Sequence, residues 1–198
     1  MQSAEIELKF PIADPSSLES VLPGLGFQLE TPRTFEHNTL YDTPERALRS
    51  RRQLLRIRQY GAVCTLTHKR QPEGADDSVY KTRIETETTV ADGEALAAIF
   101  AQLGYRPAFV YEKFRTEWVY LLGSDRAHLV IDETPIGIWA ELEGPTDWID
   151  RMLLALQVDP HTCSTESYGK LFMLWKERTG SPAQDLAFVQ IANAIATV

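Results

Sequence analysis

The stretch EIELKF, residues 5–10, places Glu5, Glu7 and Lys9 at every second position, with apolar residues between them. Strict alternation over so short a run is typical of a β-strand, because successive side chains leave the backbone on opposite faces. One face of this strand is therefore apolar and the other is charged. A surface strand of an open sheet would show the same pattern, so the fold depends on whether other segments repeat it.

Charged residues recur at this spacing along the chain. They are found in LLRIRQY (Arg56, Arg58), TLTHKR (Lys69), YKTRIETET (Arg83, Glu85, Glu87), EKFRTEW (Lys113, Arg115) and WAELEG (Glu141, Glu143), and Asp132 stands among apolar neighbours in LVIDETP. Cross-strand salt bridges on an open sheet would explain any one of these segments. The whole set is better explained by a sheet that closes on itself, with its charged face lining a lumen and helices covering its apolar outside.

The remaining pattern predicts an α+β fold. Helical spacing and capping residues predict helices within residues 13–26, 92–104, 146–157, 165–180 and 183–196, and the polar residues 71–78 predict a loop. Gly180, Ser181 and Pro182 interrupt the helical pattern. We therefore expect one domain over residues 1–180, followed by an amphipathic helical tail, 181–198, that packs on the barrel or on a second subunit of a homodimer.

The composition limits the partners of the protein. The chain has 198 residues with 20 basic and 28 acidic side chains, a formal net charge of −8. Broad attraction to nucleic acid or to an anionic membrane is not expected, and an anionic ligand would need a local basic site. The sequence has neither a signal segment nor a run approaching the roughly 20 apolar residues of a membrane helix, which predicts a cytoplasmic protein.

A lumen lined with charged side chains is expected to bind charged ligands. Like charges removed from water cost several kcal/mol each unless they are paired or bound to a counter-ion. Lysines and arginines from separate strands predict an anion with several oxygens, and grouped carboxylates predict a divalent cation, Mg²⁺ or Mn²⁺, which prefers oxygen ligands. A metal bound to a polyphosphate would use both sets at once.

Together these motifs resemble one known family. ExExK at residues 5–9, YDTP at 41–44, the pairs at 56/58, 113/115 and 141/143, the R-x-E-x-E at 83–87, IDETPIG and SYGKL at 167–171 are similar, in this order, to the CYTH domain or triphosphate tunnel metalloenzymes. That family includes class IV adenylyl cyclases, thiamine triphosphatases and inorganic triphosphatases. The resemblance covers residues 4 to about 175 and implies an eight-stranded antiparallel β-barrel forming a closed tunnel, with helices outside, that binds a triphosphate and a divalent metal.

The resemblance also implies roles for single residues. The expected catalytic residues are Glu5, Glu7 and Lys9. The expected metal ligands are Glu5, Glu7, Glu141 and Glu143, with Glu85, Glu87 and Asp132 as further candidates. The expected substrate-binding cations are Lys9, Arg56, Arg58, Lys69, Arg83, Lys113, Arg115 and, from a C-terminal helix, Lys170. Arginine grips phosphate oxygens with two prongs and lysine acts as a point charge, so this mixture suits a chain of phosphates.

Two reactions can follow from such a site. In a hydrolase, water attacks the terminal phosphorus of inorganic triphosphate or a nucleoside triphosphate; in an adenylyl cyclase, the ribose 3′-hydroxyl attacks the α-phosphorus and pyrophosphate leaves. We expect hydrolysis, because no residue is dedicated to a purine or a ribose, and keep the cyclase as the alternative. The thiamine triphosphatases of the family carry YYDT where this chain has LYDT, so Leu40 disfavours that substrate. A polyphosphate binder without activity is disfavoured because carboxylates would hinder capture of an anion.

Overall fold

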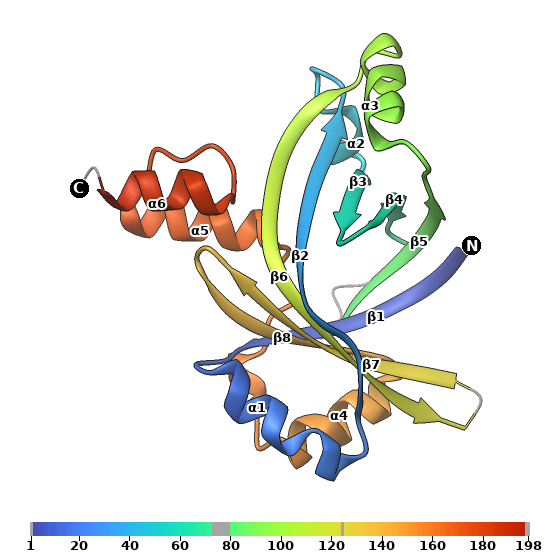
Figure 1. The fold of residues 1–198 in the computed structure, drawn as a ribbon, viewed down its shortest axis with the longest axis vertical. Helices are drawn as coiled ribbons and strands as arrows, with labels where there is room; N and C mark the ends of the chain where they lie inside the picture. The colour runs from blue at the N-terminus through green and yellow to red at the C-terminus, as the bar shows by residue number, and fades with distance from the viewer. Residues whose placement is uncertain (1, 73–79, 124, 197–198) are drawn as a thin grey trace.

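The computed structural model describes residues 2–72, 80–123 and 125–196, and its centre is a closed β-barrel. The strands are β1 (Gln2–Pro11), β2 (Gln28–Asp42), β3 (Leu54–Tyr60), β4 (Val63–Arg70), β5 (Lys81–Thr89), β6 (Arg106–Leu122), β7 (Asp125–Thr134) and β8 (Gly137–Glu143). Their order around the barrel is β1-β5-β4-β3-β2-β6-β7-β8, and every neighbouring pair is antiparallel (Figure 1). The predicted α+β fold with a closed eight-stranded barrel is confirmed.

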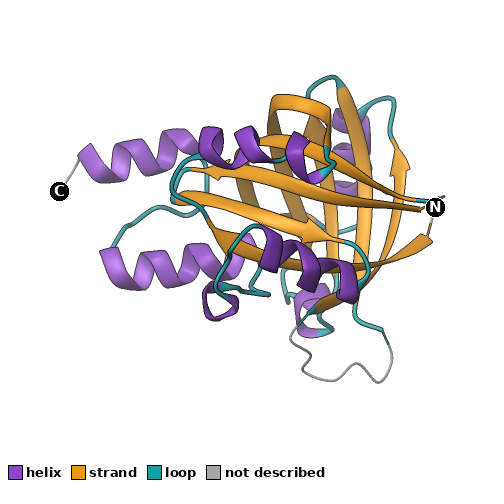
Figure 2. Cartoon of the chain, turned by 90° about the horizontal axis from the view of Figure 1, so that it is seen from below, coloured by secondary structure: helices purple, strands orange, loops and turns teal. Residues whose placement is uncertain are grey.

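The helices lie outside the barrel (Figure 2). They are α1 (Pro15–Val21), α2 (Ala47–Ser50), α3 (Gly93–Gln102), α4 (Thr146–Ala155), α5 (Tyr168–Thr179) and α6 (Phe188–Ala196), with short 3-10 turns at Pro23–Leu25 and Pro160–Thr162. The predicted loop 71–78 falls largely in the range 73–79, outside the described residues. No helix in the described ranges is long and apolar enough to cross a membrane.

The larger hydrophobic core lies between the outer face of the barrel and α4. Leu8 and Phe10, the apolar residues that alternate with the charged residues of β1, are buried in this core. Leu142 of β8 and Trp148 of α4 are buried there with them. Burying a large apolar side chain contributes about 1.5–3 kcal/mol. The packing of this core therefore keeps the apolar side chains of these strands on the outside of the barrel, and the alternate, charged side chains must face the lumen.

The C-terminal helices form a second core against β6. Phe172 of α5 and Ile191 of α6 are buried there with Tyr111 of β6. The segment before α6 also continues the sheet: Leu186 N–H donates to the Val110 carbonyl (3.0 Å), and Glu112 N–H donates to the Leu186 carbonyl (2.9 Å). Residues 182–194 thus pack on the barrel, whereas the proposed domain boundary at residue 180 stays a prediction.

Candidate active site

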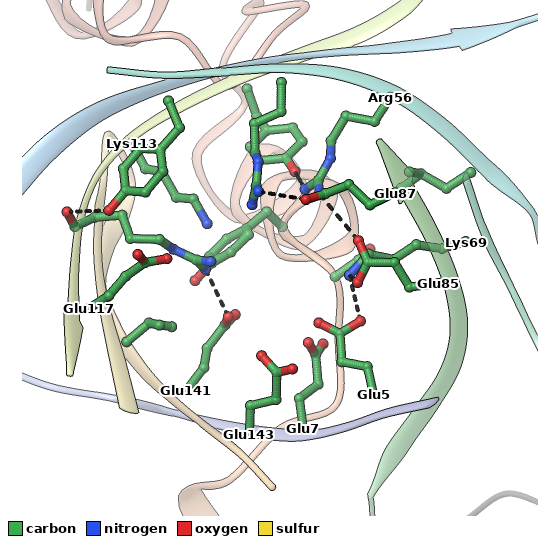
Figure 3. Close-up of a pocket in the computed structure, with 18 of the residues that line it drawn as sticks. Glu5, Glu7, Arg56, Lys69, Glu85, Glu87, Lys113, Glu117, Glu141 and Glu143 are labelled. Carbon is green, nitrogen blue, oxygen red and sulfur yellow. Dashed lines mark hydrogen bonds and ion pairs between the residues drawn. The ribbon is translucent and has the colours of Figure 1, made fainter. Parts of the chain in front are cut away.

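The barrel encloses a cavity of about 780 Å³. Six predicted cations line it, Lys9, Arg56, Arg58, Lys69, Lys113 and Arg115, and so do six predicted carboxylates, Glu5, Glu7, Glu85, Glu87, Glu141 and Glu143. These groups come from β1, β3, β4, β5, β6 and β8 (Figure 3). Residues that are distant in the sequence, and that alternation predicted to point inward, therefore line one enclosed space.

One side of the lumen is formed by β1 and β8. Glu7 lies directly opposite Glu143 in the register of the two strands, and Lys9 lies opposite Glu141. Figure 3 shows Glu141, Glu143, Glu7 and Glu5 side by side along this wall. Burial raises the pKa of Glu143 to about 8, and repulsion from Glu5 and Glu7 adds to the shift against the opposing effect of Lys69. Burial and the neighbouring carboxylates therefore both oppose ionisation of Glu143.

Lys9 lies on the same wall, beside Tyr168 of α5. It is only 2% exposed, its Nζ lies 2.7 Å from Glu141 Oε1, and it sits over the Tyr168 ring at 4.8 Å from the centroid. Burial by itself would lower the pKa of this ammonium, but Glu141 and Glu7 outweigh it and raise the pKa above its usual value. Lys9 is therefore a fixed cation, suited to hold a phosphate oxygen rather than to remove a proton from water.

Across the lumen, β3 and β4 present cations that are paired with the carboxylates of β5. Arg58 Nη2 lies 3.3 Å from Glu87 Oε1, and Lys69 Nζ lies 3.2 Å from Glu85 Oε2 and also bonds Glu5. Arg56 donates to the Tyr111 hydroxyl at 3.0 Å. Two-pronged guanidinium groups held in this way can exchange a carboxylate for a phosphate without moving their backbone.

Asp132 lies behind the lining and organises the third wall. Its carboxylate is 0% exposed and accepts from Lys113 Nζ (2.8 Å), from both Nε and Nη2 of Arg115 (2.7 and 2.6 Å) and from the Tyr168 hydroxyl (2.6 Å). Its oxygens are thus already occupied by donors. The structure gives Asp132 the geometry of a group that positions two cations, which differs from the metal-ligand role expected for it.

Two further predicted residues lie apart from the lumen lining. Arg83 shares the inward phase of β5 but is absent from the cavity wall, and its Nη1 donates to the Thr82 carbonyl at 3.1 Å. Lys170 is exposed on α5, whereas Ser167, Tyr168 and Gly169 line the cavity. Successive helical residues turn by about 100°, so residues 168 and 170 point in nearly opposite directions and only one can face the lumen.

Sequence reasoning missed three groups in or behind the wall: Glu36, Tyr111 and Tyr168. Glu36 is 0% exposed, lies 3.4 Å from Lys113 Nζ through Oε1, and accepts from Asn38 Nδ2 at 2.8 Å. Burial by itself would raise the pKa of Glu36, but Lys113 and Arg115 hold it well below its usual range. Its spacing of two from Asn38 was the available signal, but no second charged residue lies two positions away from Glu36, so it did not stand out.

The carboxylates of β1 and β8 have the chemistry of a site for a hard divalent cation. They offer only oxygen donors, and a bound cation would favour the ionised form of Glu143, which burial and then repulsion from Glu5 and Glu7 oppose. Within the described ranges, however, no group of three or more histidine, cysteine or carboxylate side chains is already arranged to hold a metal. Glu5, Glu7 and Glu143 thus fit such an ion by chemistry, and Glu5 would have to leave Lys69 to join it.

A closed antiparallel barrel with paired cations and carboxylates inside defines a charged-tunnel protein. The model of the CYTH domain matches residues 3–147. The chain therefore belongs to the CYTH family, whose members act on triphosphate substrates.

Individual relatives agree with this fold. A Methanocaldococcus jannaschii protein, whose name proposes an adenylate cyclase, is 28% identical over 139 residues, which are 70% of this chain and 75% of that protein. A Vibrio parahaemolyticus structure with the same proposed name has a TM-score of 0.67 at 19% identity, covering 85% of this chain and 97% of that one. A Hippeastrum structure, described as a proposed adenylyl cyclase with a dominant triphosphatase activity, has a TM-score of 0.60 at 20% identity, covering 88% and 96%.

Proposed function

We propose that this protein hydrolyses a triphosphate, either inorganic tripolyphosphate or a nucleoside triphosphate, inside the barrel and with the help of Mg²⁺ or Mn²⁺. The observation that carries the proposal is the pairing of opposite charges across one enclosed cavity. Arg58, Lys69 and Arg115 each contact a carboxylate inside the barrel. A triphosphate can take the place of a carboxylate as the partner of these cations, and the exchange at Lys69 would release Glu5 to join Glu7 and Glu143 at a metal.

The side chains of the tunnel have separable tasks in this reaction. Arg56, Arg58, Lys113 and Arg115 would bind phosphate oxygens, and Lys9 would hold an oxygen near the β1 wall, where its charge stabilises the anion that develops as the terminal phosphate departs. Glu5, Glu7 and Glu143 would hold the metal. Bound there, a divalent ion supplies charge neutralisation for the phosphate oxygens that face the carboxylate wall.

Adenylyl cyclase activity is the second candidate, and the name of the M. jannaschii relative favours it. The same cations could hold ATP with its α-phosphorus, instead of its terminal phosphorus, at the reacting position. The description of the Hippeastrum relative favours hydrolysis. Leu40 lines the cavity here, which places an apolar side chain where the family's thiamine triphosphatases carry a tyrosine.

The test is a parallel incubation with tripolyphosphate, ATP and thiamine triphosphate, each with Mg²⁺, with Mn²⁺ and with EDTA. Hydrolysis predicts metal-dependent orthophosphate from tripolyphosphate or ATP, whereas a cyclase predicts cyclic AMP and pyrophosphate from ATP. A protein that binds tripolyphosphate equally well in EDTA and releases no product from any substrate would be a binder, and the proposal would be wrong.

A further inference from the structure

The turn between β2 and β3 lies at one rim of the tunnel. Leu40 near the end of β2 and Leu54 at the start of β3 both line the cavity, so the intervening residues 43–53, which include α2, lie beside this end of it. The first turn of α5 packs at the same end, where Ser167 lines the cavity and is exposed to solvent. Lys69 lies opposite Leu54 in the register of β3 and β4, which places a phosphate-binding candidate next to this turn. We call this opening the α2 rim.

The turn carries four arginines, and all of them are exposed: Arg46, Arg49, Arg51 and Arg52. Arg46 donates to the Ala108 carbonyl and Arg52 donates to Gln71 Oε1, both at 3.2 Å. The side chains of Arg49 and Arg51 make no hydrogen bond or ion pair with the described part of the chain. Two guanidinium groups are thus available to an external anion, with Glu45 as the exposed carboxylate of the same turn.

The backbone of the turn is held in place independently of these side chains. The buried Asp42 carboxylate accepts from the N–H groups of Thr43 (2.8 Å), Leu48 (2.9 Å) and Arg49 (3.0 Å). Arg46 and Arg52 adopt left-handed backbone angles, φ 60° and 55°, which cost about 1 kcal/mol or more for residues other than glycine. A strained turn with a buried anchor presents its arginines in a defined place rather than on a loose loop.

The opposite opening of the tunnel is lined by carboxylates. Its lining, around Tyr60 and Val63, includes the carboxylates Glu30 and Glu117, of which Glu30 is paired with Arg126. On a protein of net charge −8, the four exposed arginines of the β2–β3 turn, against the single carboxylate Glu45, make this side the more attractive one for a polyphosphate.

We propose that the arginines of the β2–β3 turn capture the anionic substrate at the α2 rim and steer it into the tunnel. This inference rests on the proposed function, since it assumes a polyphosphate guest. Steering of this kind accelerates diffusional encounter by roughly 10- to 1,000-fold for a full charged cleft and weakens with salt. Arg49 and Arg51 act before the substrate reaches the lumen, so they affect the association rate constant of the substrate.

The experiment measures the association rate constant of magnesium tripolyphosphate by stopped-flow tryptophan fluorescence, which does not require turnover. Trp139 is a built-in reporter, because its ring meets that of Tyr168 at 5.9 Å between centroids. The variant is Arg49→Gln with Arg51→Gln. At low ionic strength we expect its association rate constant to fall ~3- to 10-fold, and at about 0.5 M salt we expect it to match the wild type.

The matched control is Arg151→Gln with Arg178→Gln, which removes the same net charge from exposed arginines of α4 and the last turn of α5. An association rate equal in both double variants would overturn steering by this turn, because total charge would then explain the effect. Equal rates in the test variant and the wild type at low salt would also overturn it. A wild type that binds tripolyphosphate but does not hydrolyse it would refute the proposed function and leave this inference standing.

Discussion

The Tyr168 hydroxyl lies 2.6 Å from Asp132 Oδ2, which ties the first turn of α5 to the carboxylate that holds Lys113 and Arg115. Tyr168 is buried, and both Lys9 and Lys113 lie over its ring at 4.8 and 4.9 Å from the centroid. A helix that packs on the outside of the barrel thus reaches the cations inside it. The packing of α5 and the arrangement of the phosphate-binding candidates are therefore physically connected.

Replacement of Tyr168 by phenylalanine tests this connection. The ring and its packing remain, but Asp132 loses one donor, so we expect the free energy of unfolding to fall by about 1–3 kcal/mol. We also expect kcat/KM for the triphosphate to fall by about tenfold, because Lys113 and Arg115 become less well positioned. Urea unfolding and initial rates measure the two effects. Tyr105→Phe removes a hydroxyl on the outer surface and serves as the control; equal behaviour of both variants would contradict the connection.

Glu36→Gln tests the buried carboxylate on β2. Removing its charge leaves Lys113 and Arg115 with one fewer partner, and breaking a buried ion pair costs about 3–5 kcal/mol. Tripolyphosphate should restore part of this stability, because it supplies negative charge at the same place. Urea unfolding with and without tripolyphosphate measures the rescue, which should be larger in the variant than in the wild type. Glu133→Gln, which breaks an outer pair with Arg33, should show no such rescue.

The pKa of Glu143, raised to about 8, predicts how stability depends on pH. The folded protein keeps this proton above the ordinary glutamate range while the unfolded chain loses it near pH 4.5, so the metal-free fold should lose stability as pH rises from about 4.5 to 8. Glu143→Gln should flatten this decline. Urea unfolding in EDTA across that range measures it, with Glu177→Gln on α5 as the control. An unchanged slope in the Glu143 variant would argue against a raised pKa of this carboxyl.

Glu7→Gln tests the carboxylate wall as a metal site. Loss of one oxygen ligand should lower turnover by about 100-fold or more and weaken metal affinity, whereas the fold should persist because Glu7 faces a polar lumen. Metal titration by calorimetry and product release measure the two effects. The control is Glu94→Gln in the exposed first turn of α3. Full activity in the Glu7 variant would remove Glu7 from the metal site.

The sequence predicted which faces of the strands are charged, but it did not show where along the tunnel each residue lies. Alternation fixes the inward phase because a one-residue slip would bury charges in the core. It therefore placed Glu7 and Lys113 correctly in the lumen. Arg83 has the same phase, yet it lies outside the lining, because the position along the tunnel depends on how neighbouring strands are staggered.

The residues that were missed depend on contacts that no local pattern contains. Tyr168 occurs in a helical segment where an aromatic side chain is typical of packing, and only the docking of α5 at the barrel gives it a polar partner. Asp132 was correctly singled out as a charge among apolar neighbours. Its partners from β6 and α5 are set by tertiary structure, and they determine that it binds cations of the protein itself.

The hydrogen bonds between Leu186 and β6 have a consequence for any shortened form of the chain. β7 pairs with β6 only from Phe114 onward, so residues 110–112 would present unpaired backbone groups if the last eighteen residues were removed. Such a bare strand edge is a template for joining one molecule to the next. A version ending at Gly180 should therefore oligomerise or precipitate where the 198-residue chain stays dispersed, which size-exclusion chromatography can follow.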